Sequence, residues 1–293
     1  MSQGKGRRSR GHFYNKNKIN VGDKGREILE NIDENNPVIL QFRSYASELD
    51  EKHDRFERLV KTGRDVTIES KRIIFLLHSI DKESKKDSVL AEAKARLENL
   101  EKTLFKSIAL ELQNEDFYQY QRAYRAGVEE YIEAITFYQY LQNGNMQDWM
   151  ELEKSLIYTV LDKTKAISDN NSVPMKNIEM LIFPNEYILG IADLTGELMR
   201  KCINNLATGD IASCYQTCNF VRNMYKGFLG CSSSAGKEVY KKLYTLKQSL
   251  AKMENVCYTI KVRGSEIPKH RLADVAIVAT EEYNADDEGY QGY

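Results

Sequence analysis

Proline is scarce in this chain, with 4 among 293 residues, and glycine, with 17, is not abundant. Short strands joined by tight turns need both residue types, so their scarcity argues strongly against an all-β fold and favours long helices. No apolar run reaches the length of about 18 residues that a membrane span needs. The first ten residues, MSQGKGRRSR, lack the apolar segment of a secretory signal. We therefore expect no membrane association and a location in the cytoplasm and nucleus.

Excess charge and familiar catalytic motifs are also missing. Lysine and arginine number 42 against 43 aspartates and glutamates, which gives a formal net charge of -1. Bulk charge cannot then bind nucleic acid, so any such binding must be local. No P-loop, dinucleotide fingerprint or nucleophile motif is present. Cys214 and Cys218 form a close pair, but no histidine or second close pair accompanies them, so the five cysteines are expected to be reduced core thiols.

The two ends of the chain carry opposite charge. Residues 1–18 contain six basic and no acidic residues, whereas 281–293 contain five acidic and no basic ones. Both segments are poor in aliphatic residues and are expected to be disordered. We expect a basic disordered arm over 1–36, a helical domain over 37–275 and an acidic tail over 276–293.

Between the tails, apolar residues recur at steps of three and four, which is typical of amphipathic helices. The segment 167–185, with two prolines and a polar run, is expected to be the longest internal loop. The pattern predicts an all-α, elongated bundle of seven helices. Their approximate ranges are 37–79, 90–108, 117–144, 148–166, 187–209, 211–225 and 239–264.

Two of the predicted helices carry paired carboxylates. Glu130 and Glu133 are three residues apart, and Asp193 and Glu197 are four apart, so each pair shares one helix face. The helix of the first pair is apolar on nearly all sides, and charged groups in such surroundings are costly unless they are paired or bound to a cation. The alternative is that these faces are solvated, with Glu197 paired to Lys201 at the next turn.

Gly127 and Gly190 each lie three residues before a carboxylate of these pairs. Glycine in a helix costs about 1 kcal/mol relative to alanine. Each glycine therefore indicates the close approach of another backbone or of a substrate, or serves helix packing alone.

If the four carboxylates converge, they form a site made only of oxygen ligands. Such a site selects Mg²⁺ or Mn²⁺ over zinc or copper. A cation held in this way polarises a phosphoryl oxygen and lowers the pKa of a water molecule, which suits phosphodiester hydrolysis.

A short basic ridge is predicted on the helix over 37–79, where Arg55, Arg58, Lys61 and Arg64 follow one another at three-residue steps. Phosphate groups could bind to this ridge. Acidic residues are interspersed along it, so an ordinary ion-paired surface is the alternative.

Three stretches resemble the translin family: ELDEKHDRFERLVKTGRDVTIESKRIIFLLH, ADLTGELMRKCIN and KKLYTLKQSLAKMENVCYTIKVRGSEIPKH. The similarity covers about residues 37–275. It implies the all-α seven-helix fold of the translin type and a hollow hetero-oligomer with translin. It also implies the role of an Mg²⁺-dependent endoribonuclease subunit that cleaves single-stranded RNA and promotes activation of the RNA-interference complex by removing passenger-strand fragments.

The resemblance also assigns residues. The family's catalytic and metal-binding acidic set falls on Glu130, Glu133, Asp193 and Glu197. The resemblance also places the family's RNA-contacting surface, which no motif defines well, on the basic ridge. The resemblance leaves open which carboxylates are ligands and which is a general base, and how many metal ions bind. The basic run at the N-terminus is of the kind that directs nuclear import. The alternative is a disordered arm without that role.

The competing hypothesis is a non-catalytic scaffold that binds translin and single-stranded DNA or RNA. The carboxylates discriminate between the two, because an acidic cluster beside a phosphate-binding cavity repels its ligand unless a cation lies between them.

Overall fold

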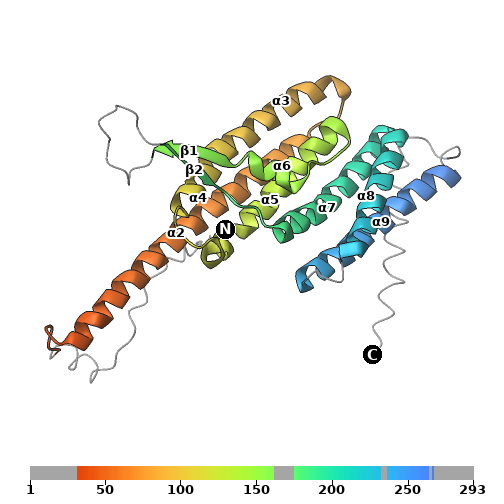
Figure 1. Ribbon diagram of the computed structural model, residues 1–293. Coiled ribbons are helices and arrows are strands. Elements are labelled where there is room, and N and C mark those ends of the chain that lie inside the picture. Colours follow the sequence, from red (N-terminus) through yellow and green to blue (C-terminus); the bar gives the residue numbers. More distant parts are fainter. Residues whose placement is uncertain (1–31, 162–174, 232–235, 264–265, 267–293) are drawn as a thin grey trace, which may run out of the picture. The chain divides into compact units, whose positions relative to one another are not determined.

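The computed structural model describes residues 32–161, 175–231, 236–263 and 266, and it consists mainly of helices (Figure 1). The predicted disordered segments 1–18 and 281–293 lie outside these residues. Two strands pair, β1 (Ile157–Leu161) and β2 (Met175–Glu179). The helical elements are α2 (Pro37–His78), α3 (Glu83–Leu100), the π-helical η1 (Glu101–Phe105), α4 (Lys106–Glu111), α5 (Phe117–Asn143), α6 (Trp149–Lys154), α7 (Pro184–Thr208), α8 (Ile211–Cys231) and α9 (Lys237–Arg263).

The fold class is confirmed as all-α. The elements α3, η1 and α4 follow one another without a break, and with this rod counted as one helix the described residues contain seven. None of these helices is apolar over a length that would cross a bilayer. The chain divides into two compact units, Met1–His53 and Asp54–Tyr293, whose boundary falls inside α2. The second unit holds the carboxylates and all contacts described below.

The helix predicted for 148–166 is wrong beyond its first turns. The helix α6 ends at Lys154, and the chain then forms β1, which pairs with β2 in antiparallel register, Tyr158 opposite Ile178. The stretch IYTVL is β-branched and aromatic, and such side chains fit a pleated, half-buried surface better than a helix. β2 also occupies part of the predicted loop, of which residues 167–174 lie outside the described part of the chain.

Helix α5 lies in the interior of the second unit. Its residues 131–138 are all buried, which confirms the prediction that this helix is apolar on nearly every side. It packs against α7, and α7 packs in turn against α8 and α9 (Figure 1). The carboxylates of α5 and α7 therefore lie at the junction of two tightly packed helices.

Two glycines permit this packing. A Cβ atom at Gly127 would come within 2.5 Å of the carbonyl oxygen of Gly63 in α2. A Cβ atom at Gly190 in α7 would come within 2.7 Å of the Ile132 Cβ atom and 2.8 Å of the Glu129 carbonyl oxygen in α5. Both glycines thus mark close helix approach, as the sequence predicted. Gly196, also in α7, has no neighbour within 4 Å of such an atom.

Candidate functional site

The four predicted carboxylates are brought together where α5 faces α7. Glu133 is 8% exposed. Burial, followed by the nearby charges of Glu130, Asp193 and Glu197, raises the pKa of Glu133 to about 8. Among the described residues, no hydrogen bond or ion pair is made by its carboxylate. Glu133 is therefore a buried acid with no directly bonded cation among the described residues, although the charge of Lys242 partly lowers its pKa.

Lysines from two other helices reach this cluster. Lys71 of α2 lies 3.6 Å from Glu130 Oε2. Lys242 of α9 donates to both carboxylate oxygens of Asp193, at 2.5 Å from Oδ2. Burial raises the pKa of Glu130, although the charge of Lys71 acts against it. These two ammonium groups offset part of the negative charge on either side of Glu133.

Glu197 has partners of another kind. His78 Nε2, at the end of α2, lies 2.5 Å from Glu197 Oε2, and Arg200 Nη1 lies 3.4 Å from the same oxygen. Burial raises the pKa of Glu197, but the hydrogen bond and charge of His78, with the charge of Arg200, outweigh burial and leave the pKa below its ordinary value. Lys201, the alternative partner considered from sequence, instead donates to the Ile80 carbonyl at 2.9 Å.

A fifth carboxylate, Glu129, belongs to the same cluster. Burial raises its pKa, while Arg125, which donates to Oε1 at 2.7 Å, and Lys242 lower it. The charge of Asp193 also acts on it. Glu129 precedes Glu133 by four residues, so the helical spacing itself could have indicated it. No residue spacing in the sequence indicated Lys71, His78 or Lys242, since each is remote in sequence from the carboxylate it contacts.

The basic ridge is partly engaged within the chain. Arg55 pairs with Glu115, and Arg58 forms two hydrogen bonds with Glu111, at 2.9 and 3.0 Å. Lys61 and Arg64 are exposed. Two of the four guanidinium and ammonium groups are thus committed to carboxylates at the end of α4 and just beyond it.

The carboxylate cluster offers oxygen donors for a metal ion, but not their arrangement around one. In the described ranges, no three histidine, cysteine, aspartate or glutamate side chains are arranged to hold a metal ion. The donor chemistry nevertheless fits a hard cation, because the ligands are carboxylate oxygens only. The buried Glu133 carboxylate, which lacks a cationic partner among the described residues, is the group that a divalent cation would compensate.

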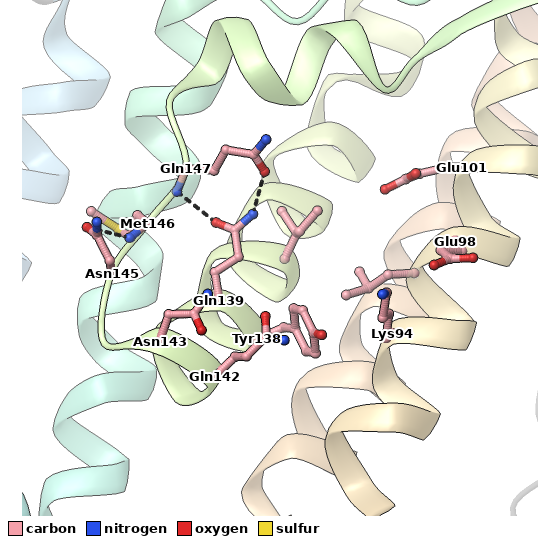
Figure 2. Close-up of a pocket in the computed structure, with 12 residues that line it drawn as sticks. Lys94, Glu98, Glu101, Tyr138, Gln139, Gln142, Asn143, Asn145, Met146 and Gln147 are labelled. Carbon is pink, nitrogen blue, oxygen red and sulfur yellow. Dashed lines mark hydrogen bonds between the residues drawn. The ribbon is translucent and has the colours of Figure 1, made fainter. Parts of the chain in front are cut away.

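A separate cavity lies between α3 and the end of α5 (Figure 2). Its volume is about 480 Å³, and its lining includes Glu101, Tyr138 and several carboxamides. Gln139 and Gln147 close one side through two mutual hydrogen bonds of 2.9 Å. The cavity contains none of the carboxylates of the candidate site, so we assign the site to the interface of α5 and α7.

The raised pKa of Glu133 predicts that the stability of the folded chain depends on pH. Its ordinary pKa of 4.5 rises to about 8 in the folded chain. Between these values the folded state holds a proton that the unfolded state has lost, so the free energy of unfolding should fall as the pH rises from about 4.5 to 8 and then level off. The fall should be on the order of 5 kcal/mol, since each pKa unit corresponds to about 1.4 kcal/mol.

Chemical denaturation of the wild type and of Glu133→Gln in chelator, from pH 5 to 9, measures this effect. The variant should lose that part of the pH dependence and exceed the wild type in stability at pH 8. Parallel pH profiles for the two proteins would contradict the burial of an uncompensated carboxylate.

Comparison with known proteins decides the family. The model of the translin family matches residues 54–264. This chain belongs to the translin family. Translin-associated protein X from Pongo abelii is 43% identical over 275 residues, which cover 92% of this chain and 94% of that relative. The protein of that name from Mus musculus is 44% identical over 249 residues, covering 84% and 86%. The homolog from Schizosaccharomyces pombe is 28% identical over 235 residues, covering 77% and 89%.

Solved structures agree with this membership at the level of the fold. AfC3PO matches with a TM-score of 0.55 and 19% sequence identity, covering 78% of this chain and all of that one. The complex of AfC3PO with duplex RNA matches equally well. Apo-NeC3PO matches with a TM-score of 0.54 and 19% identity, covering 73% and 93%. The translin-type fold that the sequence resemblance implied is therefore confirmed.

Proposed function

We propose that this translin-family chain is an Mg²⁺-dependent endoribonuclease subunit that cleaves single-stranded RNA within a hetero-oligomer with translin. The observation that carries the proposal is the buried Glu133, without a cationic partner in the described residues, facing Asp193 and Glu197 across α5 and α7. The names of its translin-associated relatives support translin as the partner. The complex of AfC3PO with duplex RNA supports RNA as the ligand. We further propose that the assembly acts in the cytoplasm and nucleus and removes passenger-strand fragments.

In this proposal Glu130, Glu133, Asp193 and Glu197 hold the cation. Bound Mg²⁺, or Mn²⁺ in its place, would supply a Lewis acid for the phosphoryl oxygen and a lowered pKa for a water molecule. In the chain without the cation the pKa of Glu133 is about 8, so binding of the cation would displace a proton from this carboxyl group near neutral pH.

The neighbouring lysines are proposed to serve the substrate. Lys71 and Lys242 hold carboxylate oxygens in the structure. Once a cation engages those oxygens, the two ammonium groups become available to phosphate oxygens, which compact positive charges bind well. These lysines, more than the ion-paired Arg55 and Arg58, supply the local positive charge that a nearly neutral chain needs.

Room for a nucleotide exists next to the cluster. A cavity of about 750 Å³ is lined by His78, by several amide and hydroxyl groups, and by lysines and acids in equal number, Lys82, Lys86 and Lys201 with Asp81, Glu83 and Asp210. These polar groups suit the sugar, phosphate and base edges of a nucleotide. None of the four carboxylates lines this cavity, but His78, which does, contacts Glu197, and we propose that substrate extends from the carboxylates past His78 along the end of α7.

The substrate form gives a test of this function. A single strand can bend to place one phosphate at the carboxylates, whereas A-form duplex is stiff and wide. We predict internal cleavage of mixed-sequence single-stranded RNA in Mg²⁺ and resistance of blunt duplex. Ca²⁺, which is larger and takes more ligands in looser geometry, should permit binding and suppress cleavage.

The measurement is a time course on end-labelled single strand and duplex, with each cation, using the chain co-assembled with translin. Because AfC3PO forms a complex with duplex RNA, binding of each substrate must be recorded separately from its cleavage. Equal cleavage of both substrates, or robust cleavage in chelator, would contradict the proposed mechanism.

One observation favours the non-catalytic alternative. Glu130, Asp193 and Glu197 each have a basic partner, so the cluster can be read as a structural ion-pair network in a scaffold that binds translin and single-stranded DNA or RNA. Absence of cleavage by an assembly that binds single strands tightly would favour this scaffold.

A further inference from the structure

His78 ties three helices together at the edge of the carboxylate cluster. It is the last residue of α2, and its side chain is 10% exposed. The imidazole packs on the ring of Phe137 in α5, with centroids 4.9 Å apart. Its Nε2 atom reaches Glu197 Oε2 in α7 at 2.5 Å. A polar ring is thus enclosed by the same helices that carry the acids.

The polar contacts of this ring point to one role. His78 Nδ1 is buried and has no hydrogen-bond partner in the part of the chain that the structure describes. A carboxylate only accepts hydrogen bonds, so Nε2 carries the hydrogen in the contact with Glu197. Burying an imidazole with one nitrogen unpartnered is unfavourable, and the one polar contact shown for the ring is with a residue of the candidate site.

The contact selects one oxygen of Glu197. Arg200 Nη1 lies 3.4 Å from Oε2, the same atom that His78 holds. Oε1 accepts no hydrogen bond among the described residues. The hydrogen bond from His78, with the Arg200 charge near the same oxygen, restricts rotation of the carboxylate and leaves the other oxygen without a hydrogen bond. Groups that hydrogen-bond a metal-binding carboxylate in this way orient it, and their loss typically weakens metal affinity or activity about 10- to 100-fold.

We propose that His78 is a positioning residue that fixes Oε2 of Glu197, so that Oε1 is presented to the cation and substrate. This inference rests on the proposed nuclease function, because it assigns a task to a residue beside that site. His78 itself touches neither the cation nor the reacting phosphate.

Three substitutions separate positioning from simple packing. Leucine in His78→Leu fills the space beside Phe137 but cannot donate a hydrogen bond. Glutamine in His78→Gln carries an amide nitrogen at the ε position, where it can replace Nε2 as donor to Glu197. Asparagine in His78→Asn carries its amide at the δ position and is too short to reach Glu197, so it is the polar control.

The experiment uses the full chain co-assembled with translin and measures three quantities for each variant: Mn²⁺ affinity by calorimetry, single-turnover RNA cleavage, and melting temperature in chelator. We expect His78→Leu and His78→Asn to lose about 10- to 100-fold in Mn²⁺ affinity and cleavage rate. His78→Gln should keep its Mn²⁺ affinity and cleavage rate within about 3-fold of the wild type. The melting temperature in chelator should fall for this variant as it does for the other two.

The outcomes distinguish this inference from the function on which it rests. If the wild-type assembly binds Mn²⁺ and cleaves RNA, and a folded His78→Asn variant does both equally well, only the positioning role of His78 is overturned. Failure of a folded His78→Gln to exceed His78→Leu in Mn²⁺ affinity overturns it too. A wild-type assembly that neither binds Mn²⁺ nor cleaves RNA overturns the proposed nuclease and the inference together.

Discussion

Glu133→Gln should abolish Mg²⁺-dependent RNA cleavage, with a rate loss of about 100-fold or more, because an oxygen-ligand site that loses a carboxylate loses its cation. Single-stranded RNA affinity should stay within a few-fold, since phosphate contacts come from other groups. The protein should remain folded, because glutamine has nearly the shape of a protonated glutamate and the Glu133 side chain makes no ion pair among the described residues. Cleavage and binding by the purified assembly measure the two effects separately.

Glu92→Gln is the matched control for this variant. Glu92 is an exposed glutamate of α3 that pairs with Arg96, away from the carboxylate cluster. Its substitution should change neither cleavage nor binding. If Glu133→Gln cleaves at the wild-type rate in Mg²⁺, the metal-binding role of this cluster is wrong.

Gly190→Ala should have the largest effect on the fold of the site. The added methyl group would lie 2.7 Å from the Ile132 Cβ atom and 2.8 Å from a backbone oxygen, and neither can move without displacing α5. Overpacking of this kind costs about 1–3 kcal/mol or more. Since α7 must shift, Asp193 should also separate from Glu133, and Mg²⁺-dependent cleavage should fall about 10-fold or more, because small misplacements at a reacting centre are costly.

Gly196→Ala provides the comparison on the same helix. No atom lies within 4 Å of its added methyl group, and alanine is favoured over glycine in a helix by about 1 kcal/mol. We expect Gly190→Ala to melt several degrees below the wild type and Gly196→Ala to melt at or above it. A Gly190→Ala variant as stable and active as the wild type would mean that the spacing of α5 and α7 does not control the site.

The helices and the carboxylates could be predicted from the sequence because their signals are local. The three- and four-residue spacing of apolar residues in 117–144 indicates α5, and the same spacing places Glu130 and Glu133 on one face. Gly127 and Gly190 indicated close helix approach, since glycine inside a helix is unfavourable without a reason. The strand Ile157–Leu161 was missed, because a short apolar run does not distinguish a strand from a buried helix.

The partners of the carboxylates could not be predicted, because they depend on how distant helices meet. His78 and Glu197 are 119 residues apart, and Lys242 lies 49 residues after Asp193. The register and rotation of α2 and α9 against α7 decide these contacts, and no residue spacing reports them.

The cysteines show the same limit. The thiol of Cys202 in α7 donates a hydrogen bond to the carbonyl of Cys214 in α8, and the Cys214 thiol donates to the carbonyl of Cys202. The Cys257 thiol of α9 lies 3.9 Å from the Cys214 carbonyl oxygen. Four of the five cysteines are buried free thiols, as predicted, whereas Cys231 is exposed. Their neighbours in space come from three helices and were not apparent from the single close pair in the sequence.

The central claim, that the facing carboxylates of α5 and α7 hold a divalent cation, is tested most directly by anomalous scattering from a crystal of the translin-bound chain soaked in Mn²⁺. We predict a peak between the two helices in contact with Glu133 and Asp193, with Lys242 displaced from Asp193, and no peak in Glu133→Gln. A crystal at saturating Mn²⁺ that shows no peak there, with Lys242 still bound to Asp193, would contradict the account.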